Sequence, residues 1–245
     1  MKLLRSITGG VLIEGHRGAE GLAVENTWEA IIAGYQAGAD LLELDIQQSS
    51  DGELVIYHSY QLPDGRWLRQ LTGDDLQKVR VKGHSIAFLK DVFEWVQGKS
   101  IGLSLDVKNG YGFDIRIFHH ILKLIDIYNI TEQVMIVGWD HAGLLWIKNH
   151  NPHVATRALI RGRPVNIVQL ARNAKVNAIN LDSDMVTEME VNALHAAGIA
   201  VVVAEMFSPD YLRPAKLGAD VICCKNPKEA RAKIEKIDKS MWLEV

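Results

Sequence analysis

The sequence predicts an α/β fold, a (β/α)8 TIM barrel, from two observations. Short apolar, β-branched runs alternate with longer segments of helical periodicity. The predicted strands are apolar along almost their whole length, as is typical of parallel strands that are covered by helices. About eight strand–helix units follow one another in 245 residues, a length that such barrels often have as a single unit. We therefore expect one barrel domain over residues 1–245.

The boundaries of these elements follow from the apolar runs and the turn residues between them. The predicted strands are 11–15, 41–46, 54–58, 101–107, 134–137, 154–159, 178–181, 199–203 and 221–224. We take 54–58 as an extension of the second strand. The predicted helices are 27–37, 91–97, 115–128, 142–149, 165–174, 187–197, 211–216 and 227–237. In the first of these helices Thr27 is placed as the N-cap and Gly38 as the stop.

Residues 59–100 interrupt this alternation. The segment contains the turn signal Pro63-Asp64-Gly65, a helix-like stretch at 74–79 and few strand signals. It is too short for a core of its own. We expect a short inserted excursion after the second strand, lying over the barrel mouth.

A doubly wound open sheet is the alternative fold. It would want a glycine-rich turn after the first strand with G-x-G-x-x-G spacing. Gly15, Gly18 and Gly21 have a different spacing, so the barrel is favoured.

Composition excludes several classes of protein. With 48% hydrophobic and 23% charged residues, the chain can bury a sizeable core and is not of a disordered or fibrous type. A net charge of −3 gives no reason to expect nucleic acid as a partner. No apolar run is long enough for a membrane span or a secretory signal. Cys223 and Cys224 are adjacent, which strains a bond between them, so we expect buried thiols and a cytoplasmic protein.

Acidic and basic residues mark the ends of the second and third strands. Glu43 and Asp45 close one, and Asp106 and Lys108 close the other. Residues two apart on a strand face the same side, and the carboxyl ends of barrel strands converge on one rim. Three carboxylates without a thiolate suit Mg²⁺, Ca²⁺ or Mn²⁺. The alternative is an ion-pair network in which Lys108 neutralises an acid with no metal.

Two histidines, His16 and His58, come at equivalent strand ends. They suit proton transfer near neutral pH, although a lone histidine of this kind is more often a satisfied core residue. Arg17 offers a planar fork to a phosphate oxygen, or forms a surface salt bridge. Glu25 and Asn26 either belong to a helix start or lie against the site, with Glu25 paired to Arg17.

Further groups follow the fourth and fifth strands. We place Arg157, Arg161 and Arg163 after strand five, where they meet an anionic substrate or form a solvated loop. Trp139, after strand four, packs on a substrate or lines the rim.

The order HRG from His16, ENT from Glu25 and GADLLELDIQQSSDGELVIYH ending at His58 resembles the glycerophosphodiester phosphodiesterase family. The resemblance continues through INLDSDMVTEMEVNALHAAGIAV and covers nearly the whole chain. It implies a (β/α)8 barrel and a metal-dependent hydrolysis of glycerophosphodiesters to an alcohol and glycerol 3-phosphate. It implies a divalent cation (Mg²⁺ or Ca²⁺, with Mn²⁺ as a third option) and a small-molecule phosphodiester as partner. The site residues that it implies are the catalytic pair His16 and His58, the phosphate ligands Arg17 and Lys108, and the metal ligands Glu43, Asp45 and Asp106.

The chain also departs from the family pattern. Asp106 stands where Glu is usual, Ser59 where Asp follows the second histidine, Ala204-Glu205 for Trp-Thr, and Cys224-Lys225 for Thr-Asp. Glu205 and Lys225 could make new polar contacts in the pocket wall that meets the alcohol.

These departures keep two other functions under consideration. One is a phosphodiesterase that acts on a lysophospholipid or a phosphoinositide-like substrate, which aromatic and apolar residues of the 59–100 segment would favour. The other is a catalytically silent barrel that binds a phosphorylated metabolite. The sequence leaves open which histidine is the base, and whether water or a substrate hydroxyl attacks. It also leaves open the alcohol, the ion and the oligomeric state.

Overall fold

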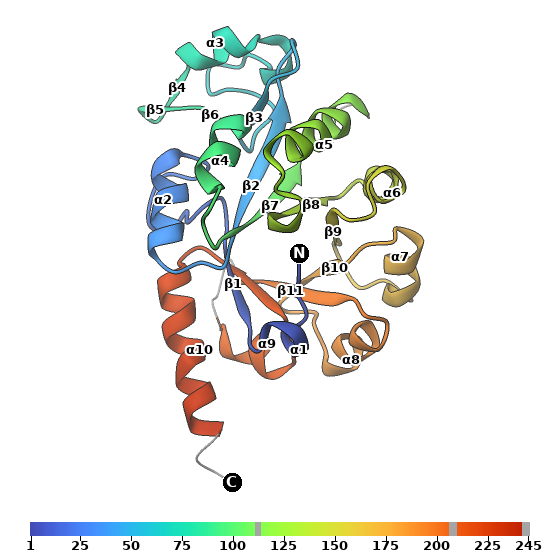
Figure 1. Ribbon diagram of the computed structural model, residues 1–245. Coiled ribbons are helices and arrows are strands. Elements are labelled where there is room, and N and C mark those ends of the chain that lie inside the picture. The colour runs from blue at the N-terminus through green and yellow to red at the C-terminus, as the bar shows by residue number, and fades with distance from the viewer. Residues whose placement is uncertain (111–113, 206–209, 242–245) are drawn as a thin grey trace.

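The computed structural model describes residues 1–110, 114–205 and 210–241. It contains a closed parallel barrel (Figure 1), which confirms the predicted fold. Its strands are β1 (Leu12–Gly15), β2 (Leu41–Gln48), β7 (Gly102–Val107), β8 (Val134–Gly138), β9 (Ala155–Leu159), β10 (Ala178–Asp182), β11 (Ala200–Glu205) and β12 (Val221–Cys224). The ring closes because β1 pairs with both β12 and β2.

Helices surround this barrel on its outside (Figure 1). They are α2 (Trp28–Gln36), α4 (Leu89–Val96), α5 (Arg116–Tyr128), α6 (His141–His150), α7 (Ile167–Asn173), α8 (Glu188–Ala196), α9 (Leu212–Lys216) and α10 (Pro227–Met241). The predicted cap is present, since the Thr27 hydroxyl accepts a hydrogen bond from the Ala30 amide at 3.2 Å. Outside the inserted segment, two short described elements were not predicted: the helix α1 (Arg5–Thr8) and the 3-10 turn η2 (Thr131–Gln133).

The core has an outer and an inner part. The outer part lies between the strands and the helices and holds most of the large apolar side chains. The inner part fills the barrel with small groups such as Ala155, Ala178 and Ala200. Leu3 plugs it at the amino ends of the strands, where the Met1 amino group pairs with Glu132 at 2.9 Å. Small interior residues leave room for polar groups nearer the carboxyl ends.

The segment between β2 and β7 extends the barrel sheet. Its elements are β3 (Leu54–Ile56), the 3-10 turn η1 (Leu68–Gln70), α3 (Gly73–Lys78), β4 (Arg80–Val81), β5 (His84–Ser85) and β6 (Ala87–Phe88). β3 runs antiparallel to the end of β2, and β6 pairs antiparallel with β3. Both paired strands turn one face to a small apolar cluster that includes Val55, Leu76 and Phe88.

This arrangement corrects two expectations. The predicted strand 54–58 ends at Ile56 and runs back along β2 instead of continuing it. The inserted segment has a small cluster of its own, because β3 and β6 supply an apolar face. In Figure 1 the segment extends outward from the end of β2, beyond α4 and α5.

Both cysteines are free and buried, as expected. Cys223 faces the barrel interior and Cys224 packs outside it, so they point to opposite faces of β12. Burial raises the pKa of Cys224 to about 12. Among the described residues, no helix is long and apolar enough to cross a membrane.

Candidate active site

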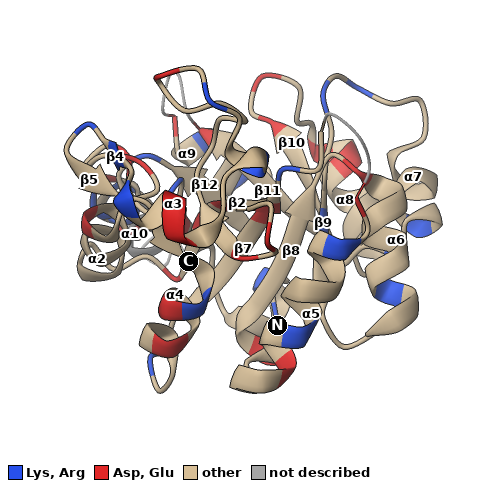
Figure 2. Cartoon of the chain, turned by 90° about the horizontal axis from the view of Figure 1, so that it is seen from above, with Lys and Arg blue, Asp and Glu red and all other residues tan. Residues whose placement is uncertain are grey.

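A cavity of about 480 Å³ opens at the carboxyl ends of the barrel strands. Its walls come from all sides of the barrel, from Asp45 on β2 through Asp106 and Asn180 to Cys223 on β12. In the side view of Figure 2, acidic and basic residues lie together on loops at one end of the barrel. Carboxyl ends of barrel strands are where function gathers in this architecture.

Three buried carboxylates form the centre of the cavity. Glu43, Asp45 and Asp106 each offer an oxygen that lies within 4.8 Å of the others. Glu43 and Asp45 lie two residues apart on β2, so their side chains point to the same side. Asp106, on the adjacent strand β7, is in register with Asp45. The structure thus brings the three predicted metal ligands together.

The electrostatics of this acidic cluster fit a cation. Burial raises the pKa of Glu43 to about 8, and the charge of Asp45 adds to that shift. Burial also raises the pKa of Asp106, whose Oδ1 atom is buried and has no hydrogen-bond partner in the described part of the chain. A divalent cation would remove the repulsion and give Oδ1 a partner.

Lys108 lies between two of these acids. Its Nζ atom is 2.7 Å from Asp45 Oδ1 and also contacts Asp106. Burial alone would raise the pKa of Asp45, but Lys108 and Arg17 hold it below its usual value. The ion-pair network considered from sequence is therefore present around Asp45. It leaves Glu43 with a raised pKa and no lysine or arginine side chain in direct contact among the described residues.

The turn after β1 is fastened to the acidic cluster by its backbone. Arg17 has a left-handed φ of 51°, and its amide donates to Glu43 Oε2 at 2.8 Å. Its guanidinium pairs with Glu25, and Nε lies 3.3 Å from Asp45 Oδ2. Arg17 is thus part of the cavity wall, and the predicted pairing with Glu25 exists. Gly18 is required for packing, because a Cβ there would lie 2.7 Å from the carbonyl carbon of Ala30.

The two histidines both line the cavity. His16 Nδ1 is 2.9 Å from Glu20 Oε1, while Nε2 lies 3.9 Å from Glu43 Oε2. Burial opposes protonation, yet the hydrogen bond to Glu20 and the charge of Glu43 raise the pKa of His16 above its ordinary value. Burial lowers the pKa of His58. Because β3 turns back along β2, it delivers His58 to the same cavity.

The predicted supporting residues differ in position. Asn26 has a φ of 59°, donates through Nδ2 to Asp45 Oδ2 at 2.7 Å and accepts from the Asp45 amide at 3.2 Å. Lys225 lines the cavity, 3.7 Å from Glu20. Glu205 is not among the residues that line it, because alternation on β11 turns Ala204 inward and Glu205 outward.

One interior pair was missed by the sequence interpretation. Arg157 lies inside β9, not after it, and its side chain is 1% exposed. Nη1 donates to both oxygens of Glu14, at 3.0 and 2.8 Å. Glu14 is two residues before His16 on β1, so strand alternation could have placed it inside the barrel.

The other residues noted after strands four and five lie at the rim or outside. Arg161 lies over the Trp139 ring, 5.6 Å from its centre, and both line the cavity. Arg163 pairs with Glu190 at 2.7 Å, outside the cavity.

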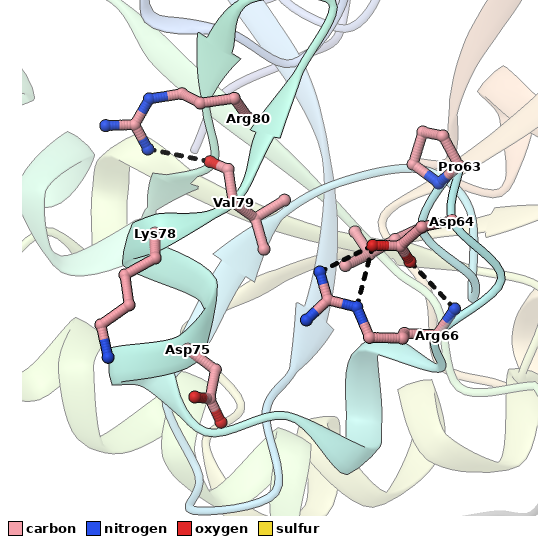
Figure 3. Close-up of a pocket in the computed structure, with 8 residues that line it drawn as sticks. Pro63, Asp64, Arg66, Asp75, Lys78, Val79 and Arg80 are labelled. Carbon is pink, nitrogen blue, oxygen red and sulfur yellow. Dashed lines mark hydrogen bonds and ion pairs between the residues drawn. The ribbon is translucent and has the colours of Figure 1, made fainter.

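A hollow of about 330 Å³ lies on the inserted segment (Figure 3). Its charged groups include Arg66, which pairs with Asp64 at 2.7 Å, and Asp75 and Lys78, which lie across from them. None of the predicted site residues lines it.

The fold and cavity define a class: a (β/α)8 barrel with an acidic cluster, two imidazoles and basic side chains at the carboxyl ends of its strands. Comparison with known proteins gives the family. Residues 16–224 match the glycerophosphoryl diester phosphodiesterase family. The chain belongs to this family, as the resemblance of its motifs indicates.

Individual relatives agree. A glycerophosphodiester phosphodiesterase from Caldanaerobacter subterraneus is 29% identical over 155 residues, which are 58% of this chain and 64% of that protein. One from Bacillus altitudinis is 27% identical over 75% of this chain and 81% of its own. The chain thus aligns with slightly less than two thirds of the first relative.

Solved structures show the same fold. A putative glycerophosphoryl diester phosphodiesterase from Silicibacter pomeroyi has a TM-score of 0.86 at 19% identity, over 94% of both chains. An Oleispira antarctica phosphodiesterase in complex with the product sn-glycerol-3-phosphate has a TM-score of 0.82 at 19% identity, over 94% of this chain and 99% of that one.

Proposed function

We propose that the protein is a metal-dependent phosphodiesterase that hydrolyses glycerophosphodiesters to an alcohol and glycerol 3-phosphate. The observation that carries this proposal is the cluster of Glu43, Asp45 and Asp106, with oxygens within 4.8 Å of one another and two histidines beside it. The names of the relatives support the reaction, and the product bound to the Oleispira enzyme supports glycerol 3-phosphate.

Glu43, Asp45 and Asp106 would hold a divalent cation, Mg²⁺ or Ca²⁺, with Mn²⁺ as a third option. Such an ion, when bound, supplies electrostatic stabilisation for the charge on the phosphoryl oxygens. Asn26 orients Asp45 for this role through its two hydrogen bonds. Arg17 and Lys108 would bind the phosphate, since both are cations already held beside the acidic cluster.

The two histidines would move the protons. His58, whose pKa is lowered by burial, would accept a proton from the attacking oxygen as that oxygen bonds to phosphorus. The attacking oxygen belongs to water, or to a substrate hydroxyl whose cyclic phosphate is then opened by water. His16, held at Nδ1 by Glu20, would donate a proton from Nε2 to the leaving alkoxide as the other P–O bond breaks. Each proton transfer is typically worth about 10²–10⁴-fold in rate.

The test is alcohol release from glycerophosphodiesters by metal-stripped protein, with Mg²⁺, Ca²⁺ or Mn²⁺ added back. We expect turnover only with a cation, and a loss of about 10²–10⁴-fold in His16→Ala and in His58→Ala at unchanged melting temperature. The control is His153→Ala, which removes an exposed histidine. Full activity in EDTA, or in either site variant, would contradict the proposal.

A second substrate class is favoured by one observation. A hollow of about 320 Å³ adjoins His58 and is lined by Ile56, Val81 and Ile86, among others. It would accept a short apolar part of the substrate, such as part of the acyl chain that a lysophospholipid carries on its glycerol. Comparing glycerophosphocholine with a short-chain lysophosphatidylcholine decides between them: faster cleavage of the lipid would support this class. Binding of both without turnover would indicate the silent barrel.

A further inference from the structure

An ion pair occupies the barrel interior below the acidic cluster. Such interiors are usually filled by branched apolar side chains. Here Glu14 and Arg157 are both fully buried, and the Ser104 hydroxyl donates to Glu14 Oε1. A buried ion pair usually adds little to stability compared with apolar groups of the same volume. Its presence at this position therefore calls for another role.

The pair lies across the barrel axis. Glu14 is on the first barrel strand, β1, and Arg157 on the fifth, β9, which faces it from the opposite side. Arg157 is in register with Val137 on β8, and Val137 with Asp106 on β7, so all three face inward. The Arg157 guanidinium consequently forms part of the cavity floor.

The guanidinium of Arg157 has a hydrogen-bond donor that Glu14 does not occupy. Both hydrogen bonds to Glu14 start at Nη1, and Nε is buried without a hydrogen-bond partner among the described residues. A buried donor without a partner is costly. The Nε side of an arginine is also part of the planar fork that binds carboxylate and phosphate in bidentate geometry.

The same cavity holds two further buried atoms without a hydrogen-bond partner among the described residues, Asp106 Oδ1 and Arg17 Nε. Arg17 Nε lies 3.3 Å from Asp45 Oδ2, so the donor of Arg157 and the acceptor of Asp106 are the two that face no opposite charge in the described part of the chain. A ligand that satisfies both carries an anion together with a cation, as a metal-bound phosphate ester does. Arg17 and Lys108 are already paired with Glu25, Asp45 and Asp106.

We propose that Arg157 binds a phosphoryl oxygen of the substrate at the cavity floor, and that Glu14 is the positioning residue that holds it there. This inference rests on the proposed function and deepens it. Glu14 keeps the guanidinium on the barrel axis. Without that anchor, Arg157 would pair with Glu43 or Asp106. Both acids are close enough for electrostatic interaction with the guanidinium.

Binding of inorganic phosphate and of sn-glycerol 3-phosphate tests the proposal, measured by calorimetry with saturating Mg²⁺ and repeated in EDTA. The main variant carries Glu14→Leu and Arg157→Met together, because apolar groups of similar volume usually preserve the fold where a single removal would not. We expect both ligands to bind about 10- to 100-fold more weakly, as for one lost charge-assisted hydrogen bond. The matched control, Arg172→Met, removes an exposed arginine of α7 that does not line the cavity and should change either affinity by less than about 3-fold.

Two single variants protect the test against misfolding. Arg157→Lys keeps the charge but removes the fork, and Glu14→Gln keeps the shape but removes the anchor charge. Weaker binding in both supports the proposal. Unchanged affinity in a folded double variant, or in Arg157→Lys, overturns it, and so does an equal loss in Arg172→Met.

The binding test of Arg157 and the activity test of the proposed function can fail independently. A wild-type protein that binds phosphate but does not cleave glycerophosphodiesters contradicts the function and leaves the comparison of affinities decisive for Arg157. A wild-type protein that binds neither ligand overturns the role of Arg157 whatever its activity.

Discussion

Two carboxylates of β2 have opposite environments although they are two residues apart. Asp45 accepts hydrogen bonds from Asn26 and Lys108, and its pKa is lowered. Glu43 faces His16 from a fully buried position, and its pKa is raised to about 8. Without a cation, burial and the charge of Asp45 thus shift Glu43 toward its protonated form. Binding of a divalent ion should release a proton there, which couples metal affinity to pH.

The neighbours of His16 predict a pH effect. Glu20 helps to raise the pKa of His16, so Glu20→Gln should lower it. If protonated His16 is the acid, activity falls as pH rises through that pKa, and the basic limb of kcat/KM should move to lower pH. The acidic limb, set by neutral His58, should stay in place.

A pH profile of kcat/KM for wild type and Glu20→Gln gives the measurement. Glu29→Gln is the control, since exposed Glu29 pairs with His84 outside the site. If neither limb moves, His16 has no part in the proton transfers. If the acidic limb moves instead of the basic limb, His16 is the base and not the acid.

At the scale of elements, helix α2 positions the turn that carries His16 and Arg17. Gly34 on this helix and Gly18 in the turn meet face to face. A Cβ added at Gly34 would lie 2.5 Å from the Gly18 carbonyl oxygen and 2.6 Å from Leu42 Cδ2. This close contact explains the glycine at position 34, whereas Gly18 has a left-handed φ of 85° and a Cβ there would meet Ala30.

Gly34→Ala separates two opposing effects. Helix propensity alone would stabilise the protein by about 1 kcal/mol. Overpacking typically costs about 1–3 kcal/mol. One of the clashing atoms here is a backbone oxygen, so a change of side-chain rotamer cannot relieve the clash. We expect a net loss of stability in urea unfolding, together with lower activity because the turn after β1 is displaced.

Gly10→Ala is the matched control for this substitution. A Cβ at Gly10 meets nothing within 4 Å, so its effect should stay within about 0.5 kcal/mol. A Gly34→Ala protein more stable than wild type would show that the helix moves away at little cost.

At the scale of the whole molecule, closure of the barrel unites residues that are far apart in the chain. β1 pairs with β12 and β2, so the turn after β1 lies beside both Lys225 and the acids of β2. We propose that residues 1–245 form one domain, with the inserted segment as part of it. The support is that β3 and β6 continue the barrel sheet from β2.

Metal binding should stabilise the whole barrel, because a cation binds the three acids where the fold brings them together and not in the unfolded chain. A ligand at 100 times its Kd adds about 2.7 kcal/mol to unfolding. For a protein of this size that corresponds to a rise in Tm of about 5–10 °C. Thermal unfolding in EDTA and in excess Mg²⁺ or Ca²⁺ measures it.

Asp106→Asn should lose most of this rise, while Asp74→Asn, at an exposed acid of α3, should keep it. An equal rise in both variants would place the responsible cation elsewhere on the protein.

The sequence was most informative where chemistry depends on strand alternation. Glu43, Asp45 and Asp106 were predicted to share a side, and they do, because alternation and the register of adjacent strands are local properties. Glu205 was predicted to reach the cavity from its place at the end of a strand alone. Because side chains alternate along β11, Ala204 takes the inward position and Glu205 does not line the cavity. Arg157 was placed after its strand, so its pairing with Glu14 across the barrel was missed.

The sequence by itself determined the order of strands and helices, the family and the residues that form the acidic cluster. These follow from apolar periodicity and from motifs whose members are close together in the chain. Only the tertiary structure decided that β3 turns back to bring His58 to the cavity, and that Arg157 reaches Glu14 through the barrel. Contacts between distant strands depend on how the sheet closes, and no local pattern of residues specifies that closure in atomic detail.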